Sequence, residues 1–186
     1  MIESGVTKPK KSLVEDGLVI WITGFSGAGK TTLAKSLRAE IFNNFNINAI
    51  HLDGDELRAA FDAETNTFDK ESRLNLALTY ARLTRLLAIQ GNIVIVSTIS
   101  MFSEIYEWNR FNQPNFFEIF LDISFDELTV RNSKGVYSDV RGNQRTDVAG
   151  VDVSCDLPDS PDLVLDSFSN GQNVSEICLA IFKGRI

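Results

Sequence analysis

Hydrophobic and β-branched residues gather in short runs along the chain, and stretches with helical spacing separate these runs. Five such runs predict strands at residues 18–22, 48–52, 93–96, 116–121 and 163–165. Apolar residues three or four positions apart predict helices over residues 31–42, 72–90 and 174–182. In the second of these, Leu76, Tyr80, Leu83 and Leu87 are expected on one face. Strands that alternate with helices are typical of a parallel sheet covered on both faces, so we expect an α/β fold with a central parallel sheet of about five strands. Ligands then bind beyond the C-terminal ends of the strands.

Two segments do not follow this pattern. Residues 1–16 are polar and basic in part, and we expect them to form a flexible N-terminal arm before a single domain over residues 17–186. Residues 132–161 are polar, contain several glycines and prolines, and show little periodicity. A long irregular segment within a compact domain is usually functional, so we expect a lid over about residues 132–161. A disordered excursion is the alternative.

Composition narrows the class of protein. The 186 residues are 44% hydrophobic and 23% charged, as in ordinary soluble domains. The net charge of −7 disfavours nucleic-acid polymers and anionic membranes as partners. No stretch approaches the ~20 apolar residues of a membrane-spanning helix, and residues 1–16 do not have the apolar run that is typical of a secretory signal. Two cysteines outside any CxxC pattern indicate a reducing compartment, so we expect a cytoplasmic protein.

The turn between the first predicted strand and helix carries a phosphate-binding motif. Residues 24–31 fit G-x-x-x-x-G-K-[ST] at every fixed position. Glycines there let backbone N–H groups approach phosphate oxygens, Lys30 places a cation on the β- and γ-phosphates, and Thr31 offers its hydroxyl to Mg²⁺. We therefore expect a MgATP site formed by Gly24, Ser26, Gly27, Ala28, Gly29, Lys30, Thr31 and Thr32. The motif does not identify what accepts the phosphate.

A second polar cluster follows the second predicted strand. Asp53 and Asp55 lie where that strand gives way to a helix, and Arg58 follows three residues later. Phosphoryl transfer needs a carboxylate near the attacking hydroxyl, to orient it, to take its proton or to hold the metal through water. Arg58 is suited to a bidentate contact with an anionic acceptor. The alternative for Asp55 is that it only caps the next helix.

The P-loop followed by Asp-Gly-Asp-x-x-Arg resembles the adenylylsulfate kinases, which phosphorylate the 3′-hydroxyl of adenosine 5′-phosphosulfate with ATP. Phe68 and Arg73 match the family's aromatic and arginine acceptor positions, and Ile99-Ser100 matches its Ile-Ser-Pro. Residues 131–137 are similar to its Arg-Asp-Pro-Lys-Gly-Leu-Tyr, and residues 149–152 to its Thr-Gly-Ile-Asp. The matches extend from about residue 17 to residue 165 and imply a P-loop NTPase fold.

The resemblance also implies a role for each matching residue. Asp53, Lys30 and Lys134 would be catalytic, and Arg131 and Arg141 would belong to a lid over ATP. Mg²⁺ would sit on Thr31, and on Asp53 through a water molecule. The acceptor, a small nucleotide, would contact Asp53, Asp55, Arg58, Phe68, Arg73, Ile99, Ser100, Lys134 and Val148. Family members are commonly dimers, which makes a homodimer an expectation for which the residues themselves provide no interface.

The sequence departs from the family on the acceptor side. Leu76 replaces a family asparagine and fits an apolar stripe instead, Val148 replaces a phenylalanine that stacks on the acceptor base, and Met101 replaces a proline. Stacking on a base contributes about 1–3 kcal/mol, so its loss favours a weaker adenine contact or a smaller base. The ATP side is intact.

Three hypotheses follow. The first is a kinase for adenosine 5′-phosphosulfate. The second keeps the chemistry and changes the acceptor, for example to a cytidine diphosphate phosphoramidate in capsule-sugar pathways. The third is a non-catalytic nucleotide-binding module, which the intact Asp53 and Lys134 disfavour.

Five further residues carry no assigned chemistry. His51 is interpreted as packed or solvated, Trp21 as a core residue and Cys155 as inert. For Phe102 and Trp108 the sequence leaves open whether they face the acceptor or a partner subunit.

Overall fold

The computed structural model describes residues 16–61, 70–131, 155–166 and 174–183. Most of the predicted arm and of the predicted lid therefore lies outside the described residues, as do the whole of the segment around Phe68 and the predicted site residues Lys134, Arg141 and Val148.

The centre of the fold is a parallel sheet. Its strands, in the spatial order β2-β3-β1-β4-β5, pair in parallel throughout. Their bounds are β1 Leu18–Gly24, β2 Ile50–Asp53, β3 Ile93–Ser97, β4 Phe116–Leu121 and β5 Leu163–Leu165. The predicted parallel α/β sheet of about five strands is confirmed, and all strands end at one edge.

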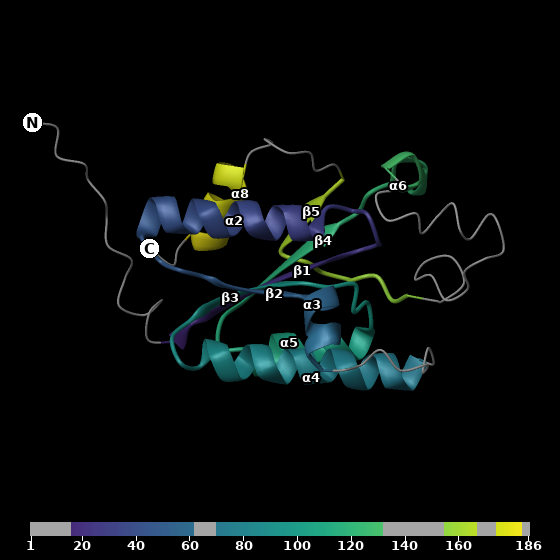
Figure 1. Ribbon diagram of the computed structural model, residues 1–186, viewed down its shortest axis with the longest axis horizontal. Coiled ribbons are helices and arrows are strands. Elements are labelled where there is room, and N and C mark those ends of the chain that lie inside the picture. The colour runs from purple at the N-terminus through teal and green to yellow at the C-terminus, as the bar shows by residue number, and fades with distance from the viewer. Residues whose placement is uncertain (1–15, 62–69, 132–154, 167–173, 184–186) are drawn as a thin grey trace, which may run out of the picture.

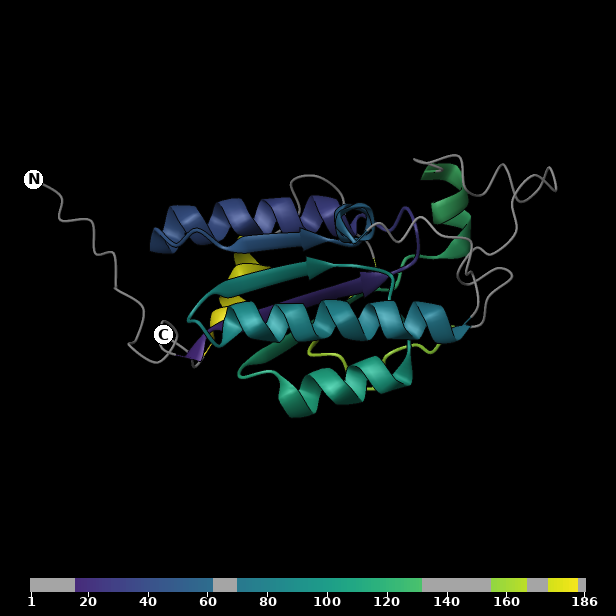
Figure 2. The same ribbon diagram turned by 60° about the horizontal axis from the view of Figure 1, so that its bottom comes forward.

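Helices cover both faces of this sheet. The described helices are α2 Lys30–Phe45, α3 Gly54–Ala60, α4 Lys70–Ala88, α5 Ser103–Asn112, α6 Phe125–Arg131 and α8 Val174–Phe182. Figure 1 shows α2 and α8 on one face and α4 and α5 on the other. Figure 2 shows the strands pointing toward the end of the molecule at which α6 lies, so the loops at that end are placed to form a site.

Strand β1 divides the core into two layers. All seven of its residues are buried, which is typical of a central parallel strand. Alternate side chains point to opposite faces of a strand, so Leu18, Ile20 and Ile22 pack with α2 and α8, and Val19 and Trp21 pack against α4 and α5. Trp21 is fully buried, as predicted.

The predicted face of α4 is wrong in part. The predicted stripe was Leu76, Tyr80, Leu83 and Leu87, but the buried residues of α4 are Ala77, Tyr80, Ala81, Thr84 and Ala88. Small side chains in the centre of the contact let the helix approach the sheet closely, and the leucines pack at its margins. Gly91 lies just beyond this helix with φ 83° and donates its N–H to the Ala88 carbonyl at 2.8 Å, as expected of a residue that ends a helix.

Helix α5 was not predicted. The residue before it, Phe102, provides no side-chain capping bond, so the usual signal of a helix start is missing. The two aromatic residues near this helix lie on the α4 side of the sheet. Phe102 is buried among the residues under α4 and α5, and Trp108 packs against the same cluster.

Glu118 is a buried charged residue of the central sheet. It is 1% exposed on β4 and accepts a hydrogen bond from Arg110 at 2.8 Å, and its backbone N–H donates to Asp162. Burial raises the pKa of Glu118 above its usual value, although Arg110 opposes the shift. Among the described residues, no helix combines the length and apolar character needed to cross a membrane.

The raised pKa of Glu118 makes stability depend on pH. The folded protein binds this proton more tightly than the unfolded chain does, so the stabilisation present at low pH is lost as pH rises through the raised pKa. We expect the free energy of unfolding of the wild type, minus that of Glu118→Gln, to fall as pH rises above about 4, the ordinary range of a glutamate, and through the raised pKa of Glu118. Urea denaturation of both proteins at a series of pH values measures this difference in the free energy of unfolding. A difference that is constant or rises with pH contradicts the assignment.

Candidate active site

The loop between β1 and α2 has the backbone shape that phosphate binding requires. Gly24, Gly27 and Gly29 have φ values of 148°, 78° and 102°. Residues other than glycine rarely adopt these backbone conformations. A Cβ on Gly24 would also lie 2.8 Å from the Leu121 carbonyl oxygen. Helix α2 begins directly after Gly29, so its N-terminal N–H groups face the loop.

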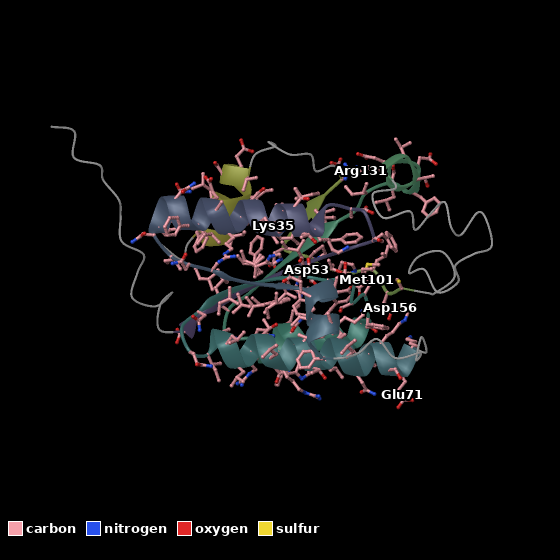
Figure 3. All side chains as sticks on the ribbon, viewed as in Figure 1. Lys35, Asp53, Glu71, Met101, Arg131 and Asp156 are labelled. Carbon is pink, nitrogen blue, oxygen red and sulfur yellow. The ribbon has the colours of Figure 1, made fainter. Side chains whose placement is uncertain are left out.

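Two cationic side chains lie against this loop. Lys30 donates from Nζ to the carbonyl oxygens of Gly24 at 2.9 Å and Phe25 at 2.8 Å. Arg131, at the end of α6, donates from Nη1 to the Ala28 carbonyl at 3.3 Å and pairs with Glu127. Figure 3 shows Arg131 at the same end of the molecule as Met101, beyond the end of the sheet at which Asp53 lies. An anion on the loop would therefore meet positive charge from α2 and α6.

Asp53 is the centre of a hydrogen-bond network that joins helix α2, helix α3 and strand β3. Its Oδ2 accepts from the Thr31 hydroxyl at 2.6 Å and from the Ser97 hydroxyl at 2.8 Å, and its Oδ1 accepts from the backbone N–H of Asp55 at 3.0 Å. Asp53 and Ser97 are register partners on β2 and β3, which places the two side chains together. The carboxylate thus connects the phosphate loop to α3 and β3.

The hydrogen bonds to Asp53 determine its protonation state at neutral pH. Burial alone would raise the pKa of this carboxyl, but the hydrogen bonds from Thr31, Ser97 and the Asp55 amide outweigh it and hold the pKa below its usual value. Asp53 is therefore an anion at neutral pH. A carboxylate of this kind orients a donor or attracts a cation more readily than it removes a proton.

The oxygen atoms around Thr31 fit Mg²⁺. The single hydroxyl proton of Thr31 goes to Asp53, which leaves the lone pairs of Oγ1 for a cation. In the described part of the chain, no group of three or more acidic, histidine or cysteine side chains is arranged to hold a metal ion by itself. Mg²⁺ commonly binds through one or two protein oxygens together with substrate phosphates, so the donor set suits a metal that arrives with ATP.

The predicted acceptor residues that are described lie around the same edge. Asp55 and Arg58 are exposed on α3, and Arg73 is half-buried in the first turns of α4. Ile99 and Ser100 follow β3, where the Ile99 carbonyl accepts from the Thr23 hydroxyl at 2.8 Å and the Ser100 hydroxyl contacts that of Thr98 at 2.8 Å. These contacts fix the loop backbone beside the P-loop strand.

Steric constraints explain why the residue between Asp53 and Asp55 is a glycine, Gly54. A Cβ on Gly54 would lie 3.0 Å from Thr98 Oγ1 and 3.3 Å from the Ser97 carbonyl oxygen. Glycine therefore lets α3 start close against the end of β3. Asp53 caps this helix through its bond to the Asp55 amide, so capping belongs to Asp53 and not to Asp55.

Two departures from the family pattern have packing explanations. Met101 is 2% exposed and forms a buried cluster with Tyr106 and Phe120, against which Cys155 packs. Its carbonyl accepts from the Asp156 amide at 3.2 Å, which attaches the segment before β5 to the loop after β3. Leu76 packs at the margin of the apolar cluster under α4, as its place in the stripe indicated.

Sequence reasoning missed four residues near the site. Ser97 and His51 belong to the Asp53 network, because His51 Nε2 lies 2.8 Å from Ser97 Oγ. Phe61, which follows α3, stacks on Tyr80 of α4 with ring centroids 6.0 Å apart. The position of Ser97 in the sequence could have indicated its role, because it is a polar residue at the C-terminal end of a predicted central strand, where ligands bind.

Comparison with known proteins relates this geometry to a family. A family model described as adenylylsulphate kinase matches residues 16–166. A cytidine diphosphoramidate kinase from Campylobacter jejuni is 37% identical over 165 residues, which cover 89% of this chain and 95% of that protein. An adenylyl-sulfate kinase from Clostridium kluyveri is 31% identical over 157 residues, which cover 84% and 78%.

A solved structure agrees with the sequence matches. The Mycobacterium tuberculosis APS kinase CysC, in complex with AMPPNP and APS, superposes with a TM-score of 0.78 at 28% identity. The match covers 90% of this chain and 96% of that one.

The buried hydroxyl of Tyr80 provides a test of the structure near the site. Among the described residues it is buried and has no hydrogen-bond partner. Removing such a group relieves a desolvation cost, so we expect Tyr80→Phe to raise the free energy of unfolding by about 1 kcal/mol in thermal or urea denaturation. Tyr106→Phe is the matched control. It should destabilise by about 1 kcal/mol, since its hydroxyl donates to the Asp156 carbonyl at 2.9 Å. Destabilisation by Tyr80→Phe would contradict this account.

Proposed function

The chain belongs to the adenylylsulphate kinase family of P-loop kinases, and from this membership we propose that it transfers the γ-phosphoryl group of MgATP to a hydroxyl of a cytidine diphosphoramidate-type nucleotide. The family makes it a phosphotransferase with a hydroxyl acceptor and ATP as co-substrate. A non-catalytic binding module is therefore set aside. The acceptor and the role of each residue are the proposed part.

The bond between Thr31 and Asp53 supports the chemistry. It places the anionic carboxylate of Asp53 2.6 Å from the hydroxyl of Thr31 in the phosphate-binding motif. The same carboxylate therefore lies between the proposed metal-binding hydroxyl and the proposed acceptor-binding residues. Oδ2 is occupied by two donors, whereas Oδ1 accepts only the Asp55 amide among the described residues. The second lone pair of Oδ1 is available to accept the proton of the attacking hydroxyl.

The steps assigned to the protein are binding, orientation and charge neutralisation. The P-loop amides and Lys30 bind the phosphates, and Arg131 adds positive charge from α6. Asp53 orients the acceptor hydroxyl for in-line attack, and the proton passes to Asp53 or to solvent as the bond forms. Thr31, and Asp53 through a water molecule, would hold Mg²⁺, which would supply neutralisation of the phosphate charge. Lys134 and Arg141, outside the described residues, stay predicted contributors.

Two observations support the cytidine acceptor. The Campylobacter jejuni relative shares 37% identity, against 31% for the Clostridium kluyveri adenylyl-sulfate kinase. The departures from the adenylylsulfate kinase pattern also lie on the acceptor side. Leu76 provides an apolar contact within the α4 cluster where that pattern has a polar residue. A smaller pyrimidine acceptor needs fewer polar and stacking contacts than adenine does.

Adenosine 5′-phosphosulfate is the second candidate. The similarity to the Mycobacterium tuberculosis kinase structure, which contains APS, favours it, as does the match of the family model over residues 16–166. Asp55, Arg58 and Arg73 would contact either acceptor, since both carry negative charge.

Steady-state rates of ADP formation distinguish the two acceptors. We expect turnover of MgATP with cytidine diphosphoramidate to have a kcat/KM at least about tenfold above that with adenosine 5′-phosphosulfate, because a difference of about 1.4 kcal/mol in transition-state binding produces that ratio. A reaction without acceptor is the control for hydrolysis. The opposite preference would assign the chain to adenosine 5′-phosphosulfate and remove the cytidine proposal.

Asp53→Asn tests the role of the central carboxylate. The amide cannot accept from Thr31, Ser97 and the Asp55 N–H all together, because its NH₂ group would face one of these donors. We expect kcat to fall by about 100-fold or more. Circular dichroism checks that the fold is preserved, and Glu107→Gln, which changes an exposed carboxyl on α5, should retain wild-type rates. A folded Asp53→Asn protein with near-normal kcat contradicts the role.

A further inference from the structure

His51 contacts the site through a serine. It is the single histidine of the chain and lies half-buried on β2, two residues before Asp53. Side chains two apart on a strand share one face of the sheet. The imidazole Nε2 lies 2.8 Å from Ser97 Oγ, and Ser97 Oγ lies 2.8 Å from Asp53 Oδ2. The three side chains form a continuous chain from the strand interior to the carboxylate.

Counting protons fixes the direction of these hydrogen bonds. Asp53 is an anion and only accepts, so the single hydroxyl proton of Ser97 goes to Asp53. The Ser97 oxygen must then accept from His51, which requires the proton of the imidazole to be on Nε2. Both bonds therefore run one way, from His51 to Ser97 to Asp53.

We propose that His51 is a positioning residue for phosphoryl transfer, acting through Ser97 to hold the Asp53 carboxylate in the orientation that joins Thr31 to the acceptor side. This inference rests on the proposed role of Asp53. His51 makes no contact with substrate in the proposal. Its effect is geometric, since a bond that fixes Ser97 Oγ also fixes one of the two donors that hold Oδ2.

The surroundings of Asp53 explain why such an anchor matters. Oδ1 is held by a single backbone amide, at 3.0 Å, and Oδ2 by two hydroxyls that can each rotate about a side-chain bond. Thr31 has a second task toward the cation, so Ser97 is the donor whose only role in the network is to hold Asp53. With Ser97 tethered by His51, the carboxylate plane has less freedom to turn away from the acceptor hydroxyl.

The environment of the imidazole agrees with a neutral donor. Burial is the largest influence and lowers the pKa of His51. Asp53 and Glu56 raise this pKa, and Lys35 and Arg38 on α2 lower it. Figure 3 shows Lys35 on the helix that covers this face of the sheet. A neutral ring carries one N–H, and the geometry places it toward Ser97.

One spectrum tests the hydrogen-bond chain directly, because a single histidine gives a single set of ring signals. Two-bond ¹H–¹⁵N correlation of protein labelled with ¹⁵N-histidine, at about pH 8, reports which ring nitrogen carries the proton. We expect the Nε2–H tautomer in the wild type and a loss of this preference in Ser97→Ala. A wild-type Nδ1–H tautomer, or a Ser97→Ala spectrum identical to that of the wild type, would overturn the proposal. This readout needs neither acceptor nor turnover, so it stands apart from failure of the proposed function.

Kinetics of a double mutant test the effect on turnover. We expect Ser97→Ala and His51→Phe each to lower kcat by about tenfold with the KM for ATP within about twofold, and the double variant to equal Ser97→Ala alone. His51→Gln, whose amide NH₂ can reach the position of the imidazole Nε2–H, should recover most of the rate.

Three outcomes contradict the positioning role. One is that losses in kcat multiply in the double variant, which would mean that His51 acts by another route. Another is that His51→Phe lowers only the melting temperature and leaves kcat unchanged, which would make the histidine a packing residue. The third is that His51→Gln, folded by circular dichroism, is as slow as His51→Phe.

Discussion

The hydrogen bond between Thr31 and Asp53 is the contact on which the rest of the site depends. It joins the first turn of α2 to the end of β2 at 2.6 Å, and the same carboxylate caps α3 and binds Ser97 on β3. Elements that bind phosphate and elements that face the acceptor therefore share one anion. Its low pKa follows from those donors and keeps it charged at neutral pH. The parallel sheet makes this possible, because adjacent strands end at one edge and in register.

Local patterns allowed much of this arrangement to be predicted. Buried strands such as β1 are continuous apolar runs, and the P-loop is a fixed spacing of glycines, lysine and threonine whose backbone shape has a direct steric cause. Both features depend only on residues that are adjacent in the sequence, so the sequence alone is enough to predict them. The face of α4 was predicted less well, because the choice between leucine and alanine at the sheet depends on how closely the helix packs, which periodicity does not report. Helix α5 lacked a capping signal and carries a mixed sequence.

Side-chain contacts between different strands could not be predicted from the sequence. Ser97 and His51 are 46 residues apart, and nothing near either residue indicates that they meet at Asp53. The register of β2 against β3 produces that meeting, and register is set by the crossover connections and the packing of whole helices. The same holds for Phe61 and Tyr80, whose rings stack between α3 and α4. Phe68, Lys134, Arg141 and Val148 stay predictions for the acceptor and lid side.

In the proposed reaction, the Asp53 network directs the γ-phosphoryl group to a nucleotide hydroxyl and not to water. Time-resolved ³¹P NMR of the protein with MgATP and cytidine diphosphoramidate tests this most directly, because it identifies where the phosphorus goes. We expect a new phosphomonoester signal on the acceptor that grows in step with ADP, with little inorganic phosphate. ADP accompanied by an equal amount of inorganic phosphate, with the acceptor unchanged, would contradict it.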